Sequence, residues 1–94
     1  MVDEDVFSAA DTFAQFCKRT DWATVVGNRT SGDGLGGAPG IFLLENTGLL
    51  VMFCYDADEN EDGTINAVNG TAPDYVCINQ SPMDLCLQLI REGN

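Results

Sequence analysis

Ser8 is a candidate nucleophile, and the residues that accompany it limit the chemistry it can do. Ser8-Ala9-Ala10-Asp11 opens a segment of helical apolar spacing, so Ser8 stands where a helix N-terminus offers free amides and a positive field. A serine nucleophile also needs a general base within about 3 Å. The chain has no histidine, and Lys18 lies ten residues along the same predicted helix. That is about 15 Å at 1.5 Å per residue, so Lys18 cannot be the base.

A structural interpretation of Ser8 competes with the catalytic one. Serine is a favoured N-cap because its side-chain oxygen accepts a hydrogen bond from an amide of the first turn, and an acid three positions on strengthens the signal. Asp11 occupies that position. If Ser8 is only an N-cap, the chain is a non-catalytic binding or structural module, and its loops are recognition surfaces.

The acidic segment 58–66 offers a third possibility, which is weak calcium binding. Asp58, Asn60, Asp62 and Gly63 match the front of an EF-hand loop. However, Asn69 stands where the closing glutamate belongs, and no helix is predicted on either side. The pattern therefore favours a solvated acidic loop, and we predict no metal site.

The elements that would position these residues follow from apolar spacing and turn residues. We expect a helix over 8–19, a short buried strand over 23–27 that runs into a glycine-rich loop, and a β-hairpin of 41–44 with 49–55. The hairpin runs barely alternate, so both faces are expected to be covered. Further on we expect short strands at 65–68 and 75–78. A final helix is expected to begin at the cap Ser81, with Leu85, Cys86, Leu89 and Ile90 as its buried stripe.

Composition excludes several classes of partner. The net charge of −11 argues against nucleic acid and anionic membranes. No apolar run reaches the roughly 18 residues of a membrane-spanning helix. The four cysteines show no metal-binding spacing, which favours free buried thiols, with a disulfide as the alternative.

In order and spacing, three motifs resemble the serine peptidases of family S41, the carboxyl-terminal processing or tail-specific proteases. They are Ser8-Ala9-Ala10-Asp11-Thr12-Phe13-Ala14, Ala23-Thr24-Val25-Val26-Gly27-Asn28-Arg29-Thr30 and Gly32-Asp33-Gly34. The hairpin, Asp62-Gly63-Thr64 and Gly70-x-x-Pro73-Asp74 continue the likeness over nearly the whole chain. The resemblance implies an α/β fold of the ClpP/crotonase-like kind, here a partial domain with a short mixed sheet, a β-hairpin and two helices.

Carried over by position, the resemblance assigns Ser8 as the nucleophile and the amide of Ala9 to the oxyanion hole. The processing-protease branch has its lysine base 25 positions after the serine, in the glycine-rich loop. Asp33 occupies that position here, between Gly32 and Gly34. A tricorn-like branch takes its base from an earlier histidine, and the Gly-Asp-Gly form fits that branch better.

The resemblance covers only the C-terminal half of the family's catalytic domain. Residues 1–94 are therefore expected to be a single partial domain of a longer peptidase, inactive alone, with its base and other oxyanion amide upstream. The implied substrate is a polypeptide, no cofactor is implied, and an extracytoplasmic location is expected. Because half a domain exposes apolar faces, we also expect self-association or a domain-swapped dimer.

Overall fold

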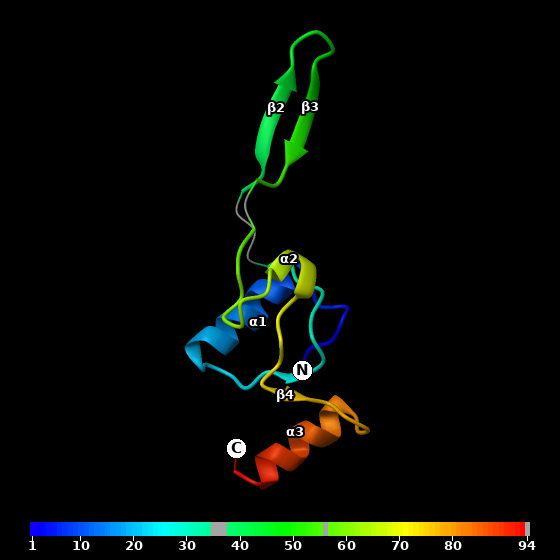
Figure 1. The fold of residues 1–94 in the computed structure, drawn as a ribbon. Helices are drawn as coiled ribbons and strands as arrows, with labels where there is room; N and C mark the ends of the chain where they lie inside the picture. Colours follow the sequence, from blue (N-terminus) through cyan, green and yellow to red (C-terminus); the bar gives the residue numbers. More distant parts are fainter. Residues whose placement is uncertain (35–37, 56, 94) are drawn as a thin grey trace.

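The computed structural model describes residues 1–34, 38–55 and 57–93. Figure 1 shows a body that contains both chain termini and a β-hairpin that projects from it. In chain order the elements are α1 (Ala9–Thr20), β1 (Val26–Gly27), β2 (Gly40–Leu44), β3 (Leu49–Phe53), α2 (Asn66–Asn69), β4 (Tyr75–Val76) and α3 (Pro82–Arg91). The α/β class predicted from the sequence is confirmed, with α2 as a helix that the sequence did not predict.

The sheet of the body is small and joins the two ends of the domain. β1 pairs in parallel with β4, and Gly27 of β1 also forms a parallel bridge to Val2, close to the N-terminus of the chain. Gly27 has φ 140°, and a Cβ there would lie 1.9 Å from the Val2 carbonyl oxygen, so only glycine lets the N-terminal segment lie so close. The predicted strands 23–27 and 75–78 are thus two residues long in the structure. α3 packs against β1.

The helices begin largely where the sequence predicts. In α3 the Ser81 hydroxyl accepts a hydrogen bond from the Asp84 amide at 3.1 Å, which confirms Ser81 as an N-cap. The predicted buried stripe of α3 is wrong in part, because Leu89 is buried but Ile90 is 69% exposed. A small core explains this: its buried apolar residues are Ala14, Cys17, Val25, Val26 and Leu89.

The predicted hairpin of 41–44 with 49–55 forms, with its second strand ending at Phe53, but its surroundings differ from the prediction. Leu44 pairs with Leu49, and Gly48 takes φ 72° in the turn that joins the strands. The expectation that both faces are covered is wrong. The side chains of β2 and β3 are exposed beyond Gly40, and the only described element that either strand contacts is the other strand.

Three smaller expectations can be compared with the structure. Residues 66–69 form α2 rather than a strand, because the Asn69 and Gly70 amides donate to Ile65 and Asn66 carbonyls in helical turns. All four cysteines are free, as favoured, but Cys17 alone is buried and Cys54 is exposed. Within the described ranges, the longest helix is too short and too polar to cross a bilayer.

Candidate active site

Ser8 sits in a sharp turn immediately before α1, and its side chain is not an N-cap. Its backbone angles are φ 52° and ψ −124°, and the Ala10 amide closes the turn by donating to the Phe7 carbonyl at 3.2 Å. N-cap residues normally have extended backbone angles, which aim the side chain at the first turn. Ser8 does not have them, and its hydroxyl makes no capping hydrogen bond. The interpretation of Ser8 as a side-chain cap is therefore wrong, and the exposed hydroxyl is left available.

The glycine-rich loop lies directly beside this turn. The Ser8 amide donates to the Gly32 carbonyl at 2.7 Å, and Phe7 and Gly32 form a parallel bridge. Gly32 has φ 85°, and a Cβ there would lie 2.0 Å from the Asn66 carbonyl oxygen. The next residue, Asp33, is exposed at φ 63°. The predicted site residues Ser8, Gly32 and Asp33 thus come from neighbouring segments.

Gly34 anchors the same loop to the first turn of α1. Its amide donates to Asn66 Oδ1 at 3.0 Å, and its carbonyl accepts from the Thr12 hydroxyl at 2.7 Å. A Cβ on Gly34 would lie 2.4 Å from the Thr12 amide nitrogen and 2.5 Å from Asp11 Oδ2. This contact requires glycine, because any side chain would separate loop and helix. The rest of the loop, residues 35–37, lies outside the described residues.

Two further predicted features concern the helix itself. Ala9 is the first residue of α1, and among the described residues its amide has no acceptor, as first-turn amides generally lack intrahelical partners. Lys18 is engaged elsewhere, because its ammonium donates to the Ala72 carbonyl at 2.5 Å and lies 3.9 Å from Asp74. Lys18 is therefore not available to Ser8.

A buried carboxylate one turn into α1 holds the segments around Ser8 together. Asp11 is 0% exposed. Its Oδ1 accepts hydrogen bonds from the Thr30 hydroxyl at 2.5 Å and the Thr71 hydroxyl at 2.7 Å, and its Oδ2 accepts from Asn66 Nδ2 at 3.0 Å. Gln15 extends the network by donating to the Thr71 hydroxyl at 2.6 Å. We call these five residues the Asp11 network.

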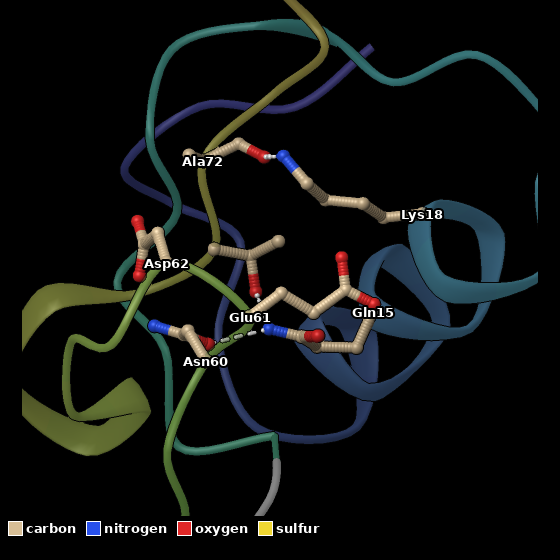
Figure 2. A pocket seen from close by; sticks show the side chains of 7 residues that line it. Gln15, Lys18, Asn60, Glu61, Asp62 and Ala72 are labelled. Atoms are coloured by element: carbon tan, nitrogen blue, oxygen red, sulfur yellow. Dashed lines mark hydrogen bonds between the residues drawn. The ribbon is translucent and has the colours of Figure 1, made fainter.

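A cavity of about 280 Å³ opens beside this network (Figure 2). In the figure the Gln15 amide points toward Asn60, to which it donates at 2.7 Å, while Lys18 reaches along the opposite wall to Ala72. The walls are Gln15, Lys18, Asn60, Glu61, Asp62, Thr71 and Ala72. Ser8 is not among them, so this cavity is separate from the candidate nucleophile.

The geometry of the acidic loop argues against the calcium alternative. Asn60 is turned into the protein, where its Oδ1 accepts from Gln15 and its Nδ2 donates to the Gly70 carbonyl at 2.7 Å. Asp62 pairs with Arg29 at 3.0 Å. Hydrogen bonds from the Thr64 hydroxyl and amide, and then the Arg29 guanidinium, hold the pKa of Asp62 far below its usual value. In the described part of the chain, no three acidic, cysteine or histidine side chains gather as a metal ion requires.

Comparisons with known proteins identify relatives of this arrangement. The sequence model of Peptidase family S41 matches residues 1–77, which include the Ser8 turn, the glycine-rich loop and the Asp11 network. Among solved structures, the chain is similar to the crystal structure of mature CPAF, at 29% sequence identity and a TM-score of 0.56. That match covers 78% of this chain and 14% of the CPAF chain. No curated protein matches the sequence.

Proposed function

Because the chain belongs to peptidase family S41, we propose that it is the nucleophile-bearing part of a serine peptidase. Ser8 attacks the peptide carbonyl while the general base takes its proton, the C–N bond breaks, and the protonated amine leaves. Water then hydrolyses the acyl-enzyme, which releases the carboxylic acid and restores Ser8. The general base comes from a part of the longer protein that precedes this chain. The chain is then a partial catalytic domain that is inactive alone.

The observation that carries this proposal is the backbone of Ser8. A serine at φ 52° is held in a region that side chains disfavour, at a cost on the order of 1–3 kcal/mol. A simple N-cap has no need of that strain, whereas a nucleophile on a sharp turn has its hydroxyl presented away from the backbone, as in the nucleophile elbow of other hydrolases. The bridge from Phe7 to Gly32 and the Ser8–Gly32 hydrogen bond supply the contacts that hold the turn.

The start of α1 supports the oxyanion role of Ala9. When Ser8 attacks a carbonyl, negative charge develops on an oxygen near the following amide. The Ala9 amide faces no described acceptor and belongs to the positive end of a 12-residue helix. It can therefore donate to that oxygen without first breaking another hydrogen bond.

The side chains that could act as a general base in this chain support a base from outside it. The chain has no histidine, and Lys18 is bound to Ala72. Asp33, at the position of the processing-branch lysine, lies on the loop against Ser8, but a carboxylate in place of a lysine favours the tricorn-like arrangement with a histidine base. The proposed substrate is a polypeptide, and an extracytoplasmic location stays a prediction of the resemblance.

The test compares Ser8 with the serine that is a cap in the structure. In the longer peptidase, Ser8→Ala should abolish peptide hydrolysis and fluorophosphonate labelling, whereas Ser81→Ala should keep both. In the isolated chain, Ser8→Ala should change the free energy of unfolding by less than about 0.5 kcal/mol, and Ser81→Ala should lower it by about 0.5–2 kcal/mol.

Two results would contradict the proposal. Full peptidase activity in the Ser8→Ala variant would remove the nucleophile assignment. Rapid fluorophosphonate labelling of Ser8 in the isolated 94-residue chain would show that a base is present within it, and would overturn the external-base assignment while leaving the nucleophile in place.

A further inference from the structure

We propose that the β2–β3 hairpin is a homodimerisation element, and that the side chains of Ile41, Leu43, Leu50 and Met52 form its seam. These four residues, which we call the seam face, would pack against the same face of a second copy of this chain around a two-fold axis. The inference concerns a part of the chain away from Ser8 and does not depend on the peptidase assignment.

The hairpin register defines two opposite faces. Ile41 pairs with Met52 and Leu43 pairs with Leu50. Directly opposed residues in an antiparallel pair point to the same side of the sheet, and residues two apart share a face. The seam face is therefore one continuous aliphatic surface. The opposite face consists of Gly40, Phe42, Leu44, Leu49, Val51 and Phe53.

The two faces are not equally open. The four seam side chains are 51–66% exposed. On the opposite face the Phe53 ring lies across Gly40, where a Cβ would meet it at 2.8 Å, and the five large apolar side chains are 39–61% exposed, with Phe53, Val51 and Leu44 below 50%. The hairpin thus covers its second face partly with its own side chains, and the seam face is the better candidate for a partner.

The area of the seam face fits a small two-fold interface. Its four side chains, 51–66% exposed, present on the order of 500 Å² at about 200 Å² per side chain. That is in the upper part of the range of about 300–600 Å² for the largest apolar patch on a typical monomer, a patch that is often functional. Joining two seam faces removes up to about 500 Å² from each copy, so the total is about 1,000 Å², the lower limit for a specific interface.

Charge and shape favour a second copy as the occupant. Within 40–53 the only charged residue is Glu45, in the turn. The chain measures 63 × 22 × 19 Å, and Figure 1 shows the hairpin at one end of its long axis. Two chains of net charge −11 can therefore meet through neutral surfaces while their acidic bodies stay apart. A two-stranded hairpin is at best marginally stable in water alone, so pairing also stabilises the hairpin itself.

The experiment uses two neighbouring leucines of β3 as test and control. Leu50, on the seam face, is 66% exposed, and Leu49, on the opposite face, is 61% exposed. Sedimentation equilibrium of the unmodified chain should show a monomer–dimer equilibrium. Leu50→Lys should raise the dimer dissociation constant more than tenfold, because a two-fold dimer contains the substitution twice, and Leu49→Lys should change it less than threefold. Both substitutions change the net charge equally, so the difference between them reports the face.

Salt gives an independent readout. Sodium chloride should strengthen the dimer, since it screens the repulsion between two acidic chains and leaves the apolar seam unaffected. Far-ultraviolet circular dichroism should confirm that both variants keep the secondary structure of the unmodified chain.

Three outcomes would overturn the proposal. A monomer at 200 µM would mean that another partner, such as the rest of a longer peptidase, covers the hairpin. Equal weakening by the two substitutions would place the seam elsewhere on the hairpin or at its edges. A dimer that is unaffected by Leu50→Lys would place the interface outside the hairpin.

Discussion

Replacing Asp11 by alanine should remove a large part of the stability of this chain. Its carboxylate is the acceptor for the hydroxyls of Thr30 and Thr71, at 2.5 and 2.7 Å, and all three groups are buried. A buried donor left without an acceptor costs about 1–3 kcal/mol. Asn66 keeps other acceptors, so two orphaned hydroxyls and a small cavity give an expected loss of about 3–5 kcal/mol. A domain of this size has about 5–14 kcal/mol in total.

Urea unfolding followed by circular dichroism measures this loss, and Asp84 provides a matched control. Both aspartates are the third residue of a helix, but Asp84 is exposed and makes no network. Asp84→Ala should lose only its interaction with the helix dipole, about 0.3–1 kcal/mol. Asp11→Asn should fall between the two, because its amide oxygen can accept both hydroxyls while its NH₂ group faces the donor of Asn66. An equal loss in Asp11→Ala and Asp84→Ala would refute the reasoning.

Two further predictions concern the loops. Hydrogen bonds from Thr64 and the Arg29 guanidinium hold the pKa of Asp62 below its usual value, so the ionised carboxylate stabilises the fold fully above about pH 4, and this stabilisation is lost as pH falls toward the lower folded-state pKa. Carbon-13 NMR should show an ionised Asp62 at pH 3, and Thr64→Val should bring its titration back toward pH 4. A titration that Thr64→Val does not move would count against the hydrogen bonds as the cause. Gly70→Ala should lower the free energy of unfolding by several kcal/mol, because a Cβ there would lie 1.8 Å from the Thr30 carbonyl oxygen. Gly48 has a similar positive φ but open space around it, so Gly48→Ala should lower the free energy of unfolding by only about 1 kcal/mol. Thermal unfolding compares the two variants, and similar melting temperatures would contradict the close contact at Gly70.

Local sequence was enough for the elements with strong terminal signals. The cap at Ser81, the periodicity of α1 and Gly48 between two apolar runs each act within a few residues, and each feature appears in the structure. The prediction failed where distant contacts decide. Residues 66–69 form a helix whose first residue, Asn66, donates a hydrogen bond to Asp11, a contact 55 residues away in sequence that no local pattern reveals.

In the candidate site, too, local sequence predicted some features and missed those that depend on distant contacts. Ser8 and Gly32 stood out by residue type, but the strained turn at Ser8 depends on Gly32, which no local pattern specifies. Thr30, Asn66 and Thr71 were missed as structural residues because hydroxyl and amide side chains in loops are usually solvated. The apolar runs of the hairpin led to the prediction that both of its faces are covered. Such runs indicate that a sheet face is suited to burial, but they do not show whether another part of the chain covers it.

The spacing of the Asp11 contacts also bears on how the chain acquires its structure during synthesis. The hydroxyls that bind Asp11 lie 19 and 60 positions later, so the carboxylate is made long before its second partner. Contacts of such long range slow folding. While the ribosome is still producing the hairpin, α1 lacks its contact with Thr71. The Asp11 network can therefore form completely only after Thr71 has emerged from the ribosome. Chains truncated before that residue should be substrates for chaperones and quality-control proteases.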